Sequence, residues 1–355
     1  MSRSFERYPN YVAITTVDWK AVLGSAKQLK GRVHTFKNTL FTTSLTSMKM
    51  KLSQLIKWIE SKTRLTTNPQ YSVTLLGLQK FRVLLIYVAR SILEWNVLHR
   101  AHRQSRKAKD RYANKDALII SGGPSTNRLN IENVLAAQSR GNLDIFALNW
   151  FTLSDIAPTI VPDFFCLSDP ITKPGSQSVF KGKRSEEIWH YLESQPTIKL
   201  ILPHNWMKHT KSFKNKVEIW IDDRELVGWS RSISVLKPRG YASVTAHKTI
   251  ASAVFMGYRN IYLIGLDNSL FKFVEVDEEN QIIETPAHSY DDVNSLDIRR
   301  QHLYPKGMQS LLYNYSLVFV DLKRCFQAAN IFNIDKSSLT DAFPKIDSEF
   351  IDQAF

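Results

Sequence analysis

The residue types that could bind a ligand follow directly after short apolar runs of the sequence. Two glycines follow the run 116–120, and polar side chains follow the runs 143–148 and 163–167. In open α/β sheets, ligands bind outside the carboxyl ends of the strands, where such residues meet. We therefore predict one pocket, formed by Gly122, Gly123, Pro124, Ser125, Asn149 and Asp169.

The two glycines favour an anionic ligand such as a nucleotide. Gly122 and Gly123 remove side chains where the chain turns, so a phosphate can approach the backbone N–H groups. A helix predicted over 130–140 would add the partial positive charge of its N-terminus. The stretch 121–125 has the residues of neither a P-loop nor a G-x-G-x-x-G turn, so a structural strand-to-helix turn is the alternative.

Two later stretches extend the same predicted pocket. A helix rich in small residues is predicted over 243–258, and its N-terminus at Thr245 would face the strand ends. Ser337 and Ser338 come just after the apolar run 331–334, so they also lie within reach.

His288 is the candidate general base, in the polar segment 268–309. A histidine titrates near neutrality and can accept a proton from a sugar hydroxyl. The alternative is a surface or hydrogen-bonded structural histidine. The acidic run 277–279 in the same segment lacks the spacing of a metal site, and we expect a solvated loop there.

Apolar runs alternate with helical or loop segments through the last two thirds of the chain, which predicts an α/β fold with a Rossmann-like, doubly wound, mostly parallel sheet. The segment 203–240 is irregular, and either a mobile flap or an acceptor-side insertion fits it. The expected strands are 116–120, 143–148, 163–167, 198–202, 217–221, 259–267 and 331–334, and a last helix covers 311–329.

The positive charge belongs to the first third of the chain. Of the 355 residues, with a net charge of +14, residues 1–115 hold 22 Lys/Arg against 5 Asp/Glu, whereas 116–355 hold 25 against 28. We therefore divide the chain into a basic helical extension, 1–115, and a nucleotide-sugar-binding catalytic domain, 116–355. Helices predicted over 35–63 and 73–102 are amphipathic, but charged residues interrupt any apolar run long enough to span a membrane.

Three functions compete for the extension. An anchor to an anionic membrane surface through 35–115 is favoured by the basic amphipathic pattern. A helical pair that makes a homo-oligomer is the second, and a nucleic-acid arm is disfavoured because no such motif occurs. The first ten residues are polar and charged, and Cys166 and Cys325 stand far apart, so we expect a cytoplasmic protein, peripheral at the inner membrane.

Over about 116–345, the ordered set of motifs resembles the bacterial lipooligosaccharide sialyltransferases. It is also similar to the domain shared by hydroxymethylpterin pyrophosphokinases and motility accessory factors. The stretches that carry the resemblance are Ser121-Gly-Gly-Pro-Ser125, Asn149-Trp150, Asp169-Pro170, Thr245 with the helix leading into Gly257–Asp267, His288-Ser-Tyr290 and Ile334-Asp-Lys-Ser-Ser338.

The resemblance implies a metal-independent, inverting glycosyltransferase. It would need no cofactor, and would transfer a sialic acid-like or other sugar from a CMP-sugar donor to a cell-surface glycan or lipid-linked acceptor. The glycine turn and Asn149 would hold the nucleotide, Asp169 would stand where the family has an asparagine, and Thr245 would replace a serine that contacts the cytidine.

The catalytic residues carried over are His288, as general base, and Tyr290, which follows it by two residues where the family has a tyrosine three residues before. The two tyrosines that stabilise the departing phosphate in that family have no match, because Ser269 stands at the first position and the nearby Phe271 and Phe273 have no hydroxyl.

Two other functions stay open from the sequence. An ATP- and Mg²⁺-dependent pyrophosphokinase of the hydroxymethylpterin type would hold its metal with Asp169 and Asp267. A non-catalytic nucleotide-binding scaffold at the membrane would bind without turnover.

We expect His288→Ala to lower turnover by about 10²- to 10⁴-fold while donor affinity is largely kept, since general-base catalysis usually contributes that much. Steady-state kinetics with a CMP-sugar would measure it. Turnover equal to that of the unaltered protein would remove His288 from this role.

Overall fold

The computed structural model divides the chain into two compact units, Met1–Trp58 and Ile59–Phe355. The fold below is that of the second unit, since Gln54 is the one residue of the first that the structure describes; the helix predicted over 35–63 otherwise lies outside the described residues. Residues described are 54, 72–180, 183–227, 229–269, 272, 274–279, 282–284, 299–300, 319–327 and 329–347.

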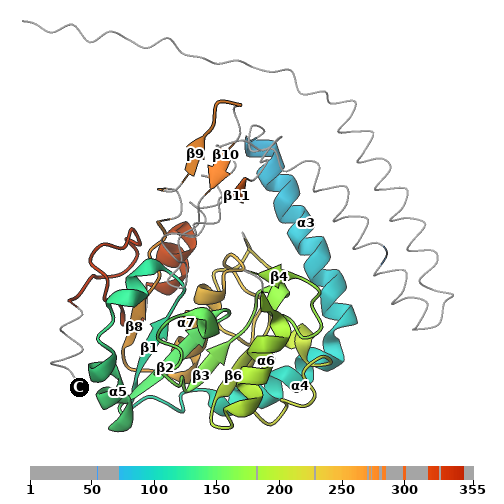
Figure 1. Ribbon diagram of the computed structural model, residues 1–355. Helices are drawn as coiled ribbons and strands as arrows, with labels where there is room; N and C mark the ends of the chain where they lie inside the picture. Colours follow the sequence, from blue (N-terminus) through green and yellow to red (C-terminus); the bar gives the residue numbers. More distant parts are fainter. Residues whose placement is uncertain are drawn as a thin grey trace, which may run out of the picture. The chain divides into compact units, whose positions relative to one another are not determined.

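A seven-stranded, all-parallel sheet forms the core, in the order β12-β8-β1-β2-β3-β6-β7 (Figure 1). This confirms the α/β, Rossmann-like, doubly wound fold. The strands are β1 Asp116–Ile120, β2 Leu143–Leu148, β3 Phe164–Cys166, β6 Lys199–Pro203, β7 Val217–Ile221, β8 Ile261–Ile264 and β12 Ile331–Asn333.

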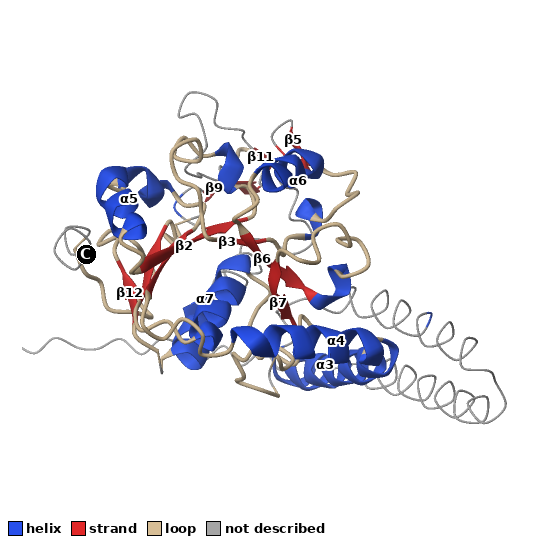
Figure 2. Ribbon diagram, turned by 90° about the horizontal axis from the view of Figure 1, so that it is seen from below, coloured by secondary structure: helices blue, strands red, loops and turns tan. Residues whose placement is uncertain are grey.

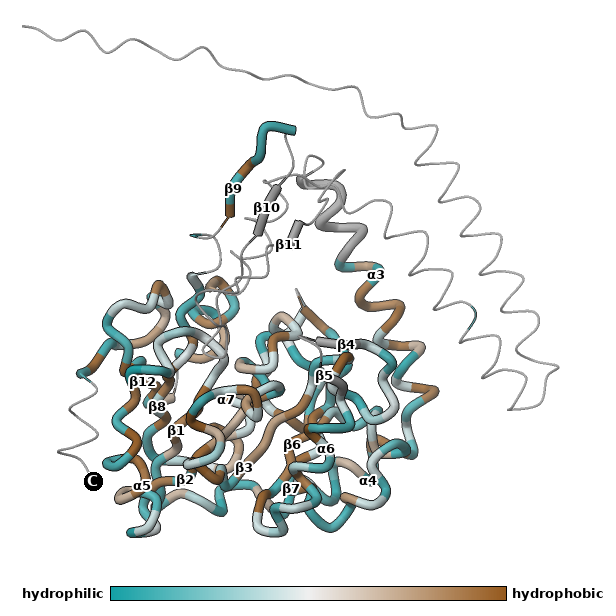
Figure 3. Tube along the Cα trace, viewed as in Figure 1, coloured by the Kyte–Doolittle hydropathy of each residue, from teal (hydrophilic) through white to brown (hydrophobic). Residues whose placement is uncertain are grey.

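Strand β1 is apolar throughout its last four residues because both faces of the sheet are covered. It pairs with β2 and β8, so that Leu118 lies level with Ile145 on one side and Tyr262 on the other. Leu118 and Ile120 enter one apolar core, while Ala117 and Ile119 enter the other. Figure 3 shows apolar residues along β3 and β6 as well.

Helices cover the two faces in separate layers (Figure 2). Helices α5 (Ile131–Ser139) and α6 (Ser185–Ser194) pack on the first core, and α7 (Thr245–Met256) and the helical residues 319–326 pack on the second. After β1 the chain enters α5 on one face, and after β8 it continues toward 319–326 on the other. The strand order therefore reverses between β1 and β8, where a doubly wound sheet opens a crevice at its carboxyl edge.

The helix predicted over 73–102 is two helices, α3 (Ser72–Leu93) and α4 (Trp95–Ser105). Glu94 breaks them, with φ −101° and ψ 2°, and its carboxylate lies 2.8 Å from His204 Nε2. Among the described residues, no helix has both the length and the apolar composition needed to cross a membrane.

Helix α4 protects the edge strand β7. Ser105, fully buried, accepts a hydrogen bond from the Trp220 N–H at 2.8 Å, and Gln104 Nε2 donates to the Val217 carbonyl at 2.8 Å. Unpaired backbone groups on an edge strand invite pairing with another chain, so these side chains close the sheet on this side. Residues 95–105 thus belong to the packing of the sheet, although they precede residue 116.

Buried ion pairs hold the chain after β7, in the segment that the sequence left open as flap or insertion. Asp222 binds Arg224 through two hydrogen bonds of 2.9 and 2.7 Å, and Asp223 lies 2.8 Å from Arg239 Nε and 2.9 Å from Lys248 Nζ. Burial alone would raise the pKa of Asp222, but the Arg224 guanidinium outweighs it and lowers the pKa. Residues 222–224 and 239 are therefore fixed to the core.

The short strands form two small sheets. Strands β4 (Val179–Phe180) and β5 (Lys183–Arg184) pair with each other, and β10 (Ile282–Glu284) pairs with β9 (Val274–Val276) and β11 (Arg299–Arg300), all antiparallel. Glu278 and Glu279 are exposed in the turn after β9, as expected of a solvated loop. The candidate catalytic residues His288 and Tyr290 lie outside the described residues.

We expect Ser105→Ala to lower the free energy of unfolding by about 1–3 kcal/mol, because the buried Trp220 N–H loses its acceptor. Urea unfolding measures this. The matched control is Ser139→Ala, whose exposed hydroxyl bonds only its own helix, and which should change stability by less than about 0.5 kcal/mol. Equal stability of the two variants would contradict the role given to Ser105.

Candidate functional site

Three polar side chains meet at the carboxyl edge of the sheet, and we call them the Asn149 cluster: Asn149 after β2, Ser168 after β3 and Thr245 at the start of α7. Asn149 Nδ2 donates to Thr245 Oγ1 at 3.0 Å, and the hydroxyls of Ser168 and Thr245 lie 2.7 Å apart. Asn149 and Thr245 are half-buried and Ser168 is buried. The predicted approach of Asn149 to Thr245 is thus confirmed as a direct contact.

Asn149 has a left-handed backbone, with φ +41°. Residues other than glycine take this conformation uncommonly, asparagine more readily than most, and such positions gather at functional sites. Its N–H donates to the Cys166 carbonyl, while its Oδ1 accepts from the Ser168 N–H at 3.4 Å. The side chain is therefore held at the strand ends by both of its polar groups.

The N-terminus of α7 opens beside this cluster. Its capping residue is Val244, which has no side-chain acceptor to offer, so the first-turn N–H groups lack a side-chain cap. Such N–H groups and the helix dipole favour an anion. The alanines and serine of α7 are buried against the sheet, which fixes the helix where its N-terminus can meet a ligand.

Asp169 lies beside the cluster, but its carboxylate binds a backbone group of the turn that follows it. Its Oδ1 accepts from the Ile171 N–H at 3.1 Å and so caps the 3-10 turn η4 (Pro170–Thr172). The side chain is half-buried, and its part in donor binding stays a prediction.

The predicted glycine turn already holds an anion of the protein itself. The Ser125 N–H donates to Asp267 Oδ2 at 3.0 Å, and the Ser125 hydroxyl makes a short hydrogen bond to Asp267 Oδ1. A Cβ on Gly123 would come within 2.5 Å of both Asp267 Oδ2 and the Gly265 carbonyl oxygen. Gly123 thus permits close approach of the turn after β8, which is a structural use of the glycine.

The predicted helix 130–140 is confirmed as α5, but its N-terminus is not at the glycine turn. The 3-10 turn η2 (Pro124–Arg128) intervenes, and Asn130 Oδ1 caps α5 by accepting from the Asn133 N–H at 3.3 Å. The N-terminus of α5 therefore does not supply its partial positive charge to Gly122 or Gly123. Whether a ligand also contacts Gly122 or Pro124 stays a prediction.

A second carboxylate, Asp335, lies next to Asp267 at the end of β12. Burial, together with Asp335, raises the pKa of Asp267 against the hydrogen bonds from Ser125. Burial would also raise the pKa of Asp335, but hydrogen bonds from Ser337 outweigh it and lower that pKa. Arg128 joins this group, with Nη1 donating to the Ser337 hydroxyl at 2.8 Å and lying 3.3 Å from Asp335 Oδ1.

The two predicted serines differ in what they can reach. Ser337 is exposed beside Arg128, so a ligand can contact it. Ser338 is buried and donates to the Leu266 carbonyl at 2.8 Å, so it ties the 335–340 loop to β8 instead of facing a ligand.

Asp169 and Asp267 are badly placed to share a metal ion. They follow β3 and β8, which are separated in the sheet by β1 and β2. Three strand spacings amount to about 14 Å, whereas metal–oxygen bonds are about 2.0–2.6 Å long. Within the described residues, no three or more His, Cys, Asp or Glu side chains gather in a way that could hold a metal ion.

Ser168 belongs to the polar residues that the sequence placed after the run 163–167, whereas Arg128 and Asp335 were not identified as members of the site. Asp335 follows a buried strand, which is the signal that identified Asn149, so it was within reach of the same reasoning. Arg128 had no such signal. Cys166, at the end of β3, is fully buried, which raises the pKa of its thiol to about 11 and leaves it unreactive at neutral pH.

No protein-family model and no curated protein sequence matches the chain. Among solved structures, the MAf glycosyltransferase from Magnetospirillum magneticum AMB-1 is similar at 15% identity with a TM-score of 0.37. The match covers 75% of this chain and 42% of that one. Because similarity of this size does not separate one α/β family from another, the function has to be argued from the site.

We expect Asp267→Asn to lower the free energy of unfolding by about 1–3 kcal/mol, because an amide offers one acceptor oxygen where Ser125 needs two. Urea unfolding at neutral pH measures it. Asp155→Asn is the control, since Asp155 is exposed, and it should change stability by less than about 0.5 kcal/mol. If the two variants were equally stable, Asp267 would not be the internal anion of the turn.

Proposed function

We propose that the protein is a glycosyltransferase that takes a sugar from a CMP-sugar donor and transfers it, without a metal ion and with inversion, to a glycan or lipid-linked acceptor. The observation that carries the proposal is the Asn149 cluster beside the uncapped N-terminus of α7. It offers hydroxyl and amide groups together with N–H donors at the edge of the sheet where such folds bind nucleotides.

In this proposal, the donor phosphate lies at the first turn of α7, and Asn149, Ser168 and Thr245 bind the nucleoside. The acceptor hydroxyl gives its proton to a general base, its oxygen bonds to the anomeric carbon, and the bond from that carbon to the phosphate oxygen breaks. The electron pair leaves with CMP. N–H groups of α7 then stabilise the departing phosphate, a task that the sequence assigns to no tyrosine.

The base in this proposal is His288, on the sequence argument alone. Arg128, in the turn after β1, and Ser337, in the loop after β12, lie along the sheet edge from the Asn149 cluster. They offer polar groups to the transferred sugar or the acceptor. A sialic acid carries a carboxylate, for which the Arg128 guanidinium is a suitable partner.

The alternatives are less well supported. The separation of Asp169 from Asp267 disfavours the pyrophosphokinase, which would need both on one Mg²⁺. A nucleotide-binding scaffold would use the same Asn149 cluster, and differs in having no turnover.

A thermal-shift panel of CMP, CDP, UDP, GDP and ATP, each with and without Mg²⁺, tests the proposal, because a ligand that binds only the native state raises Tm by mass action. We expect a shift with CMP that Mg²⁺ does not change. A shift with ATP in the presence of Mg²⁺, and with no cytidine nucleotide, would instead favour the pyrophosphokinase.

The matched variants are Thr245→Val, which removes the hydroxyl at the centre of the cluster, and Thr159→Val, which removes an exposed hydroxyl elsewhere. Losing one such hydrogen bond should weaken CMP binding by roughly 2- to 10-fold in the first variant. The second variant should bind as the unaltered protein does. If Thr245→Val binds CMP with unchanged affinity, the nucleotide does not lie at this cluster.

A further inference from the structure

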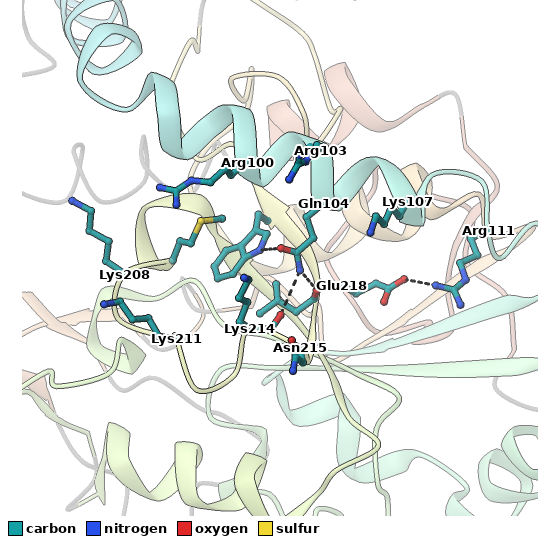
Figure 4. A pocket seen from close by; sticks show the side chains of 13 residues that line it. Arg100, Arg103, Gln104, Lys107, Arg111, Lys208, Lys211, Lys214, Asn215 and Glu218 are labelled. Atoms are coloured by element: carbon teal, nitrogen blue, oxygen red, sulfur yellow. Dashed lines mark hydrogen bonds and ion pairs between the residues drawn. The ribbon is translucent and has the colours of Figure 1, made fainter.

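A groove of about 770 Å³ lies beside the edge strand β7, between α4 and the loop that precedes the strand. Arg100, Arg103, Lys107 and Arg111 line one wall (Figure 4). Lys208, Lys211 and Lys214 lie on the facing wall. The buried Trp220 also lines the groove and donates from Nε1 to Gln104 Oε1 at 3.0 Å.

The positive charge of this groove is largely unneutralised. Glu218 is the one carboxylate among its lining residues, and it is engaged by Arg111 at 3.3 Å. Within the part of the chain that the structure describes, Arg103, Lys107 and the three loop lysines have no ion-pair partner. Seven cations around one shallow groove repel one another, so an anionic ligand would gain from neutralising them.

The groove is distinct from the candidate site. It borders the edge strand β7 at Val217, Glu218 and Trp220, whereas the Asn149 cluster lies after β2 and β3. Three strand spacings, or about 14 Å, separate β7 from β2 across the sheet. A ligand in the groove therefore leaves the carboxyl edge free.

The same pair of helices also exposes an apolar stripe. Phe81, Val88, Ile92 and Trp95 are 48–70% exposed, although they are large and apolar. Their spacing of seven, four and three residues keeps them on one side of α3 and the start of α4, because an α-helix turns 100° per residue. Arg100 and Arg103 follow Trp95 by five and eight residues in α4, so apolar and basic residues adjoin along one helical segment.

An exposed apolar stripe that continues into a basic face is the pattern of a segment that lies in a membrane interface. The apolar side chains enter the acyl boundary, a tryptophan prefers the headgroup level, and each lysine or arginine near the surface attracts anionic lipid. A nucleic acid would be attracted by the cations, but its phosphate backbone would not bury Phe81, Val88 and Ile92.

We infer that α3, α4 and the 208–214 loop form a docking surface for an anionic membrane, with lipid phosphates in the basic groove and the apolar stripe in the interface. This surface adds residues 208–214, which lie far outside the basic extension, to the predicted membrane contact. It holds the catalytic domain itself at the lipid surface, independently of residues 1–71.

Vesicle flotation of the full chain tests the inference, with phosphatidylcholine vesicles that either contain or lack phosphatidylglycerol. We expect binding to the anionic vesicles and release as salt rises from about 0.1 M to about 0.5 M, because salt screens the charges. The variant Lys208→Gln/Lys211→Gln/Lys214→Gln should bind on the order of 100-fold more weakly, at about 5-fold for each charge.

The matched control removes three exposed positive charges elsewhere, as Arg140→Gln/Lys237→Gln/Lys272→Gln, and should lose far less affinity. Trp95→Ala should weaken vesicle binding by about 10-fold at every salt concentration, since an apolar contact is not screened. Equal binding by the two triple variants would overturn the inference. So would tight binding to a DNA duplex without binding to anionic vesicles.

The triple loop variant should keep the CMP-induced rise in Tm, because the groove and the Asn149 cluster are separate. Loss of vesicle binding with the nucleotide response kept supports the inference. An absent CMP response in the unaltered protein would count against the transferase and leave the docking surface to be judged on its own result.

Discussion

The hydrogen bonds between Ser125 and Asp267 connect the turns after β1 and β8 at the carboxyl edge of the sheet. The Asp267 carboxylate accepts from the N–H and the hydroxyl of Ser125, and the same hydroxyl accepts from the Gly265 N–H at 2.9 Å. Gly123 and Gly265 lack side chains where these turns press together. The loop after β12 joins through Leu339, whose N–H donates to the Asp267 carbonyl. The strand ends after β1, β8 and β12 are consequently one unit.

Because of these hydrogen bonds, the best site for an anionic ligand is the N-terminus of α7 and not the glycine turn after β1. In many α/β proteins a glycine turn receives a phosphate, but here a carboxylate of the protein has taken that position. The Ser125 N–H and hydroxyl are therefore already paired with Asp267 and do not face a ligand phosphate. The N-terminus of α7 has no such internal anion, and Asn149, Ser168 and Thr245 gather beside it, so the proposed nucleotide site lies at the ends of β2 and β3.

Charged side chains also differ in their pairing between the interior and the surface of the fold. The buried Asp222 and the half-buried Asp223 are paired with Arg224, Arg239 and Lys248, because an unpaired charge in the interior is costly. The cations of the β7 groove face solvent, have little to match them, and are tolerated because water solvates them. The proposed chemistry lies at the ends of β2 and β3, and the basic groove lies beside the edge strand β7, three strand spacings from β2.

The sequence by itself determined the local features. Apolar runs specified strands buried on both faces, and the polar residues after them marked Asn149 and Asp169 as residues of one sheet edge, since the carboxyl ends of parallel strands must meet there. Thr245 was assigned to the same edge as the start of a predicted helix. It also separated the basic extension from the rest by charge. The break at Glu94 was not visible from the sequence, and neither was the contact of Glu94 with His204, 110 residues away.

What only the tertiary structure decided are the partners across the sheet. Ser125 and Asp267 stand 142 residues apart, and Arg128 and Asp335 stand 207 apart. Their pairing depends on β8 lying beside β1 and β12 lying beside β8, an order that no local pattern encodes. The groove has the same origin, because α4 and the 208–214 loop become neighbours only when both pack against β7. Spacing along the chain fixes which residues end a strand; strand order in space fixes which of those ends meet.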